Sequence, residues 1–289
     1  MCVEWKKISY FGVMAKQDNL IGTHPIPPDI IGRWLNGVNH PVTTTQCHRS
    51  LTETNTLNET ELIEWLSNEI IKYHYRDNQV VRLKQKYSEL GFTDYAEKIR
   101  MIPNTDKVRK GNMTEIILSE YIISSTNKPM IKTFRFRYST NVDQSMKGDD
   151  MLMIDYDNTA SDIEVYLGEA KFRQTPSPQV VRDVANALSK DTKPLSYTFL
   201  IETLIDEKAT NALGIELDGF ILETIKNQGK ITYTGLVLSN TNTSATVQAH
   251  LNSDNPKLVF LSLGIDNPTE FMENVFVRVE EKLEKPEEI

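Results

Sequence analysis

Residues 163–172 read Ile-Glu-Val-Tyr-Leu-Gly-Glu-Ala-Lys-Phe, and this stretch indicates both the fold and the chemistry of the chain. Its apolar residues recur at every second position, which is typical of a β-strand. Ile163, Val165 and Leu167 therefore share one face, and the next two positions on that face are Glu169 and Lys171. Burying an unpaired charge costs several kcal/mol, so we infer that both charged side chains have partners at the end of this strand.

The preceding predicted strand, at 149–155, has the same design. Leu152 and Ile154 share a face with Asp150, which stands at the start of that strand. The adjacent Asp149 points to the opposite face, and the shared apolar face favours Asp150 as the functional residue. Two neighbouring strands are thus expected to project an aspartate, a glutamate and a lysine towards one point.

Helices and strands alternate through the rest of the chain after residue 104. A mostly apolar helix is predicted at 112–123, and its acidic residues are Glu115 and Glu120. Further predicted elements are a helix that starts at Ser177-Pro178, strands at 231–238 and 257–263, and a helix at 268–283. This order predicts the fold class α/β, with a mixed sheet flanked by helices.

The stretch 131–138 is also predicted to be a strand. Its residues alternate between two faces. Phe134, Phe136 and Tyr138 form the inner face, while the outer face carries Thr133, Arg135 and Arg137.

The region before residue 105 gives weaker signals. Residues 1–57 are rich in Pro, Gly, Asn and Thr and are expected to form loops with short elements. Helical periodicity follows at 59–74 and again at about 78–99. With a junction at Pro103-Asn104, we predict an N-terminal accessory region at 1–104 and a catalytic core at 105–289.

The composition excludes several classes of protein. The chain has 289 residues, no apolar stretch long enough for a membrane span, and two cysteines, which cannot form a disulfide framework. No secretory leader is recognisable, so a cytoplasmic location is expected. No P-loop motif occurs, which argues against an ATP-driven motor in this chain.

The charge of the chain is unevenly distributed. The net charge is −8, and the whole excess lies in residues 201–289, which carry 7 basic and 15 acidic residues. In contrast, residues 107–137 hold seven basic side chains and only Glu115 and Glu120 as acids. That segment is a candidate contact for a phosphate backbone, although the protein as a whole would bind DNA weakly.

The clustered residue types suit metal-dependent hydrolysis. Mg²⁺, with Mn²⁺ as an alternative, prefers carboxylate oxygens, so Asp150 and Glu169 with the Ala170 carbonyl make a plausible metal site. Such a metal activates water and stabilises charge on a phosphate. Lys171 can position the water or neutralise developing charge. Glu115 can reach the same cluster from its helix, with Glu120 as the competing candidate.

Three segments together resemble a known nuclease core. Lys147-Gly148-Asp149-Asp150 and Leu167-Gly168-Glu169-Ala170-Lys171-Phe172 look like the D…ExK core of the PD-(D/E)xK superfamily. The helix at Gly111-Asn112-Met113-Thr114-Glu115 resembles the glutamate-bearing first helix of that core. With the Val-x-x-Val-Ala-Asn-Ala-Leu helix at 181–188, the pattern resembles the HamA family, nuclease subunits of Hachiman anti-phage systems.

This resemblance covers roughly residues 105–191 and implies a restriction-endonuclease-like fold. It also implies Mg²⁺-dependent cleavage of DNA and a helicase subunit (HamB) as partner, with no membrane association. Two alternatives stay open. One is an inactive nuclease-like subunit that binds DNA or serves as a scaffold, and the other is a different metal-dependent hydrolase that acts on RNA or nucleotides.

Overall fold

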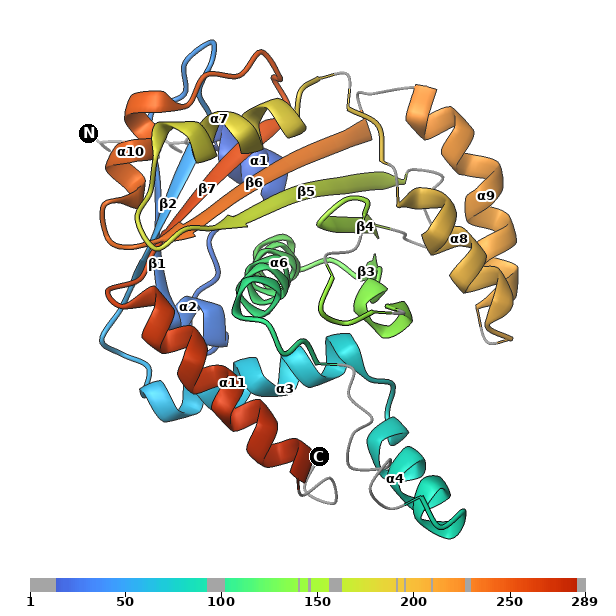
Figure 1. Cartoon of the computed structure of the whole chain (residues 1–289). Coiled ribbons are helices and arrows are strands. Elements are labelled where there is room, and N and C mark those ends of the chain that lie inside the picture. The colour runs from blue at the N-terminus through green and yellow to red at the C-terminus, as the bar shows by residue number, and fades with distance from the viewer. Residues whose placement is uncertain are drawn as a thin grey trace, which may run out of the picture.

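Seven strands of the described residues form one mixed sheet, in the order β1-β2-β7-β6-β5-β4-β3 (Figure 1). The computed structural model describes residues 14–92, 102–139, 141–144, 147–155, 163–190, 192–194, 196–208, 210–226 and 230–284. The strands are β1 (Leu35–Asn39), β2 (His48–Glu53), β3 (Met130–Lys132), β4 (Met151–Asp155), β5 (Glu164–Phe172), β6 (Ile231–Ser239) and β7 (Leu258–Gly264). The four central strands β2, β7, β6 and β5 run parallel, and antiparallel pairs continue the sheet at both edges.

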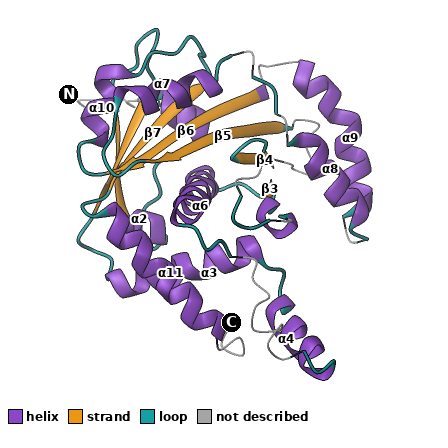
Figure 2. Ribbon diagram, in the orientation of Figure 1, coloured by secondary structure: helices purple, strands orange, loops and turns teal. Residues whose placement is uncertain are grey.

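Helices cover both faces of this sheet (Figure 2). One face packs against α6 (Asp106–Thr126), with α3 (Glu59–His74) and α11 (Pro268–Glu284) beyond it, and the other against α7 (Pro178–Ala187), α8 (Tyr197–Asp206) and α10 (Thr243–His250). The remaining helices are α1 (Lys16–Ile21), α2 (Ile30–Trp34), α4 (Gln79–Glu89) and α9 (Asn211–Lys226). The predicted fold class, a mixed α/β sheet flanked by helices, is therefore confirmed.

Local sequence signals explain where the main helices start. The Asn58 side chain accepts a hydrogen bond from the backbone N–H of Thr60 at the start of α3. In the same way, the Ser177 hydroxyl accepts from Val180 N–H, and Pro178 occupies the first turn of α7. Along the described part of the chain, no helix combines the length and the apolar character needed to cross a bilayer.

Strand alternation divides the core into two layers, as the sequence predicted. Leu152 and Ile154 of β4 lie in the same core cluster as Val165 and Leu167 of β5, under α7 and α8. The intervening residues of these strands, with Tyr166 among them, face α6 instead. The predicted strands at 149–155, 163–172, 231–238 and 257–263 are confirmed as β4, β5, β6 and β7.

The predicted strand at 131–138 is wrong over most of its length. Only Met130–Lys132 pairs with β4, and residues Arg135–Tyr138 form a 3₁₀ helix, η1. Phe136 is buried and stacks on the His74 ring, with the ring centroids 4.8 Å apart. The aromatic spacing therefore reflects packing against α3, and Arg135 points inwards with 6% of the residue exposed.

The sheet contains strands from both sides of the predicted boundary at residue 104. Residues 48–52 of β2 pair in parallel with 260–264 of β7, and β1 adds an antiparallel edge. The division at 104/105 stays a prediction about domains. Of the helix predicted at about 78–99, α4 covers Gln79–Glu89, and residues 93–99 lie outside the described residues.

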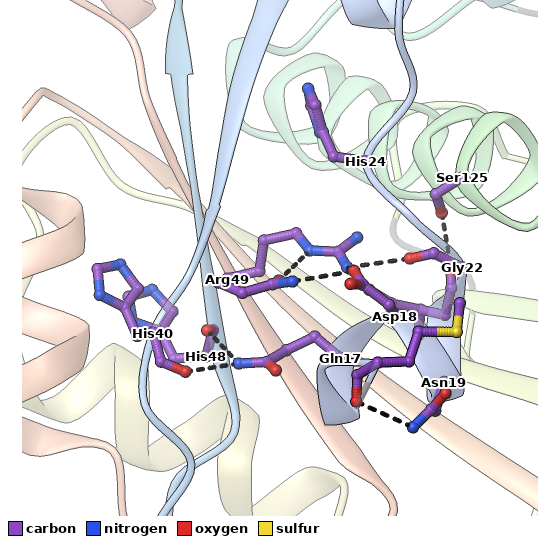
Figure 3. A network of polar contacts seen from close by, with 12 residues as sticks. Gln17, Asp18, Asn19, Gly22, His24, His40, His48, Arg49 and Ser125 are labelled. Atoms are coloured by element: carbon purple, nitrogen blue, oxygen red, sulfur yellow. Dashed lines mark hydrogen bonds and ion pairs between the residues drawn. The ribbon is translucent and has the colours of Figure 1, made fainter. Parts of the chain in front are cut away.

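A buried arginine ties these N-terminal strands to the core (Figure 3). Arg49 of β2 is fully buried and donates hydrogen bonds to Asp18 (2.6 Å), the Gly22 carbonyl (2.9 Å), Asn39 (2.7 Å) and the Tyr121 hydroxyl (3.0 Å). These partners come from α1, the loop after it, β1 and α6. One guanidinium thus links residues 18–22, β1 and α6, three separate segments of the chain.

Candidate active site

Asp150 lies immediately before β4, beside the C-terminal half of β5. Its Oδ2 accepts a hydrogen bond from the backbone N–H of Ala170 at 3.0 Å. The same oxygen lies 3.4 Å from Lys171 Nζ, and Oδ1 lies 3.3 Å from Arg135 Nη2. The Asp150 carboxylate therefore links β5 to the 3₁₀ helix η1.

Glu169 and Lys171 lie on the same face of β5 and form an ion pair with each other. Burial raises the pKa of Glu169, and the neighbouring charge of Asp150 raises it further, against the opposing effect of Lys171. Burial opposes the charged form of Lys171, but Asp150 and Glu169 outweigh it, so the pKa of Lys171 is raised. The lysine is thus held as a cation against two carboxylates.

Glu115 enters the same cluster from α6 through Arg135. Arg135 Nη2 lies 2.5 Å from Glu115 Oε2, and the Glu115 side chain is 12% exposed. Burial raises the pKa of Glu115 to about 8, although the Arg135 charge acts in the opposite direction. The structure therefore brings together all four predicted side chains, Asp150, Glu169, Lys171 and Glu115, and adds Arg135.

Arg135 is the site residue that sequence reasoning missed. It was assigned to the outer face of a strand, but the 3₁₀ turn of η1 directs it into the cluster. The available signal was a count: the acids Glu115, Asp150 and Glu169 outnumber the single predicted cation, Lys171. A buried cluster with that imbalance favours a further cation, which can be a metal ion or a second basic side chain.

The two adjacent aspartates have different environments. The Asp149 Oδ2 accepts a hydrogen bond from the backbone N–H of Ser196 at 2.7 Å, and the Ser196 hydroxyl accepts one from the Asp149 N–H. Asp149 thus fixes the start of α8. Gly148, with a φ of +124°, makes this turn, and a Cβ there would lie 2.4 Å from Ser196 Oγ. Of the two aspartates, Asp150 is the one whose carboxylate contacts Lys171.

The two candidate glutamates of α6 also differ. Glu120 lies 2.6 Å from Lys132 Nζ, and its Oε1 accepts a hydrogen bond from the Tyr73 hydroxyl at 2.7 Å. No contact recorded for the described residues joins Glu120 to Asp150 or Glu169, whereas Glu115 shares Arg135 with Asp150. The geometry therefore favours Glu115, as motif position did.

The basic segment 107–137 does not form a continuous cationic surface. Five of its seven basic side chains are paired with carboxylates, several of them distant in sequence: Arg109 with Glu280, Lys110 with Asp106, Lys128 with Asp155 and Glu164, Lys132 with Glu120, and Arg135 with Glu115 and Asp150. Arg137 donates to the Lys72 carbonyl and lies over the Phe134 ring. The charge count along the sequence therefore overstated the affinity of this segment for phosphate.

Comparison with known proteins identifies the family. The family model described as HamA matches residues 29–279 of this chain. The chain belongs to the HamA family. It is also 35% identical over 275 residues to the Hachiman protein HamA of Bacillus cereus, covering 93% of this chain and 97% of that protein. The match begins well before residue 105, so the HamA unit includes β1 and β2 as well as the motif strands.

The donor set of this HamA family member fits a single hard divalent cation. Within the described residues there is no group of three or more His, Cys, Asp or Glu side chains that could hold a metal together. Asp150 and Glu169 form a smaller set of two carboxylates, whose mutual repulsion a cation would relieve. In an antiparallel pair the N–H and C=O of one residue point to the same side, so the Ala170 carbonyl faces the Asp150 side as well. Mg²⁺ is compatible with so few protein ligands because it retains several waters.

Proposed function

We propose that this chain is a metal-dependent nuclease that hydrolyses DNA phosphodiester bonds. The observation that supports it best is the convergence of Asp150, Glu169 and Lys171 on one point at the ends of two neighbouring strands. Asp150, Glu169 and the Ala170 carbonyl would hold Mg²⁺, or Mn²⁺ in its place. Bound there, the ion would supply Lewis-acid stabilisation of charge on the phosphate and acidify a water molecule.

The protein's own side chains have distinct roles in this proposal. Lys171 is 34% exposed at its side chain, which makes it the most accessible member of the cluster. Its ammonium would neutralise negative charge that develops on the phosphate and orient the attacking water. Asp150 and Glu169 keep that ammonium fixed, and Glu115 completes the charge balance through Arg135.

We further propose that the protein acts in the cytoplasm, as the effector of an anti-phage complex with a helicase subunit. The family membership and the likeness to a Hachiman protein support this role. The charge distribution supports delivery of the substrate by a partner. With a net charge of −8 and most of the basic segment already paired, the isolated protein has little free positive charge to hold a phosphate backbone.

The test is cleavage of supercoiled plasmid, with Mg²⁺ and with EDTA, by the protein alone and together with the helicase encoded beside it. The wild type should nick in Mg²⁺ only, and Glu169→Ala/Lys171→Ala should lose on the order of 100-fold or more of the rate. Glu164→Ala is the matched control, because Glu164 lies at the other end of β5 and pairs with Lys128. It should cut like the wild type.

The outcomes separate the alternatives. A double variant that cuts as well as the wild type would contradict the proposed site. A wild type that binds DNA in a mobility-shift assay but cuts nothing, even with its partner, would support a binding or scaffold subunit. A single-stranded RNA substrate in parallel reactions distinguishes a ribonuclease.

A further inference from the structure

Arg135 lies between two carboxylates in the position that a second cation would take. Its guanidinium pairs with Glu115 on one side and Asp150 on the other, at 2.5 and 3.3 Å. Its side chain is only 8% exposed, whereas that of Lys171 on the far side of Asp150 is 34% exposed. Arg135 is thus a permanent part of the interior, and Lys171 faces the accessible side.

With all five groups charged, the cluster carries one excess negative charge. Three carboxylates meet two cations in this cluster: Glu115, Asp150 and Glu169 against Arg135 and Lys171. One divalent ion would convert one excess negative charge into one excess positive charge. A second divalent ion beside Arg135 would add two further positive charges and raise the excess to three in a buried site, which the low internal dielectric opposes strongly.

The available space points the same way. The cavity lined by Glu115, Arg135 and Asp150 has a volume of about 10 Å³. A single water needs about 10–15 Å³, so the cavity has no room for a Mg²⁺ ion that keeps part of its hydration shell. Arg135 Nη2 occupies the space between Glu115 Oε2 and Asp150 Oδ1.

We propose that Arg135 is an internal counter-cation that keeps Glu115 out of the metal shell and so limits the site to one divalent ion, held by Asp150, Glu169 and Ala170. This inference rests on the proposed metal-dependent nuclease. It assigns Arg135 a positioning role: the residue acts through Glu115 and Asp150 and does not touch the substrate. It also gives Glu115 a role as the anion that holds Arg135 in place.

The experiment counts bound ions directly. Mn²⁺ is titrated into the purified full-length protein at fixed pH, and the free ion is measured by electron paramagnetic resonance. The wild type and Glu115→Gln should each bind one Mn²⁺ per chain. Arg135→Met should bind two, because Glu115 and Asp150 then face each other without a counter-cation. Arg135→Lys, which keeps the charge, should bind one.

A double variant separates a specific role from a structural one. If the second ion in Arg135→Met uses Glu115, then Arg135→Met/Glu115→Gln should return to one ion per chain. Circular dichroism checks that each variant is folded. Should Arg135→Met fail to fold, Arg135→Gln takes its place, because it also removes the charge and should bind two ions.

Several results would overturn the inference, and they differ from a failure of the proposed function. Two ions in the wild type and one in Glu115→Gln would show that Glu115 binds metal despite Arg135. One ion in a folded Arg135→Met would show that Arg135 does not limit the count. No ion in the wild type, or an unchanged titration in Asp150→Asn, would instead remove the metal site itself, and the inference with it.

Discussion

Replacing Arg49 by methionine should destabilise the protein severely, and the size of the effect follows from its partners. The substitution takes one buried donor each from Asp18, the Gly22 carbonyl, Asn39 and the Tyr121 hydroxyl, while Asp18 keeps the hydrogen bond from Asn39 Nδ2 at 2.9 Å. An unsatisfied neutral group costs about 1 kcal/mol and a carboxylate about 2, giving about 5 kcal/mol as an upper value. Asp18 is 19% exposed and retains some hydration, so we expect a loss of about 3–5 kcal/mol.

Urea unfolding followed by circular dichroism measures this loss. An effect of this size corresponds to a fall in Tm on the order of 10 °C for a chain of this length. Arg33→Met is the matched control. Arg33 pairs with Glu61 at 2.6 Å, the same distance as the Arg49–Asp18 pair, but the Arg33 and Glu61 side chains are 33% and 46% exposed. Water replaces the lost partner there, so the urea midpoint should stay within experimental error.

A comparison of single and double variants tests the physical reason. If the cost comes from the stranded carboxylate, Arg49→Met/Asp18→Leu should be more stable than Arg49→Met alone. Equal losses in Arg49→Met and Arg33→Met would refute the claim that burial decides the value of these two ion pairs. The claim would also be refuted if the double variant lost more stability than the sum of the losses in Arg49→Met and Asp18→Leu.

Three further predictions concern stability. Burial lowers the pKa of His74 to about 4 from an ordinary value near 6.5, so the unfolded chain takes up a proton at a higher pH than the folded protein does. The contribution of the neutral His74 to the free energy of unfolding is therefore complete above pH 6.5 and is lost as the pH falls towards 4. Between pH 7 and 5 the wild type should lose about 2 kcal/mol more than His74→Gln in urea unfolding, and parallel pH curves would contradict this. Gly168→Ala should lower the stability by about 1–3 kcal/mol, because the added Cβ would lie 2.8 Å from a side-chain atom of α6. Gly111→Ala is its control: open space surrounds that position, so the substitution should stabilise the protein by about 0.5–1 kcal/mol. Equal Tm shifts in the two variants would argue against the close approach at Gly168. Asp149→Ala should lower the stability by about 1–3 kcal/mol through the lost bond to Ser196 N–H, while Mn²⁺ titration should give the same count as the wild type; a lost ion would make this aspartate a ligand.

The parts of the site that strand alternation controls were predictable from the sequence. Glu169, Lys171 and Asp150 follow apolar residues at a spacing of two, and the neighbouring strands bring them together without further information. The start of α7 was equally local, because Ser177 and Pro178 supply the cap and the first turn. In each case the residues that determine the conformation lie within a few positions of one another.

Arg135 could not be placed in the same way, because its surroundings come from tertiary contacts. The alternating aromatics at 134–138 have the period of a strand, so the local pattern does not predict the 3₁₀ turn that forms there. Phe136 stacks on His74 of α3, which lies about sixty residues earlier in the chain. That contact turns the chain after β3 and directs Arg135 to Glu115 and Asp150.

The two N-terminal strands were hidden for a related reason. β1 reads Leu-Asn-Gly-Val-Asn and β2 reads His-Arg-Ser-Leu-Thr-Glu, with few apolar residues in either. Their pairing depends on β7 and on the buried hydrogen bonds of Arg49, and neither leaves a periodic trace in the local sequence. Strands whose buried faces are polar give no signal of the kind that alternation detects.

The pairing of β2 with β7 has a consequence for how the protein is made. Residues 48–52 find their partner only when residues 260–264 have left the ribosome, so most of the chain must be synthesised before the sheet can close. Such distant parallel pairings form slowly, and their open strand edges are exposed to aggregation until they do. The hairpin of β4 and β5, by contrast, joins neighbouring segments and can form while the chain is still growing. A truncated product would therefore carry the motif strands but leave β2 without its partner, and only the full-length chain can bury Arg49 in its finished setting.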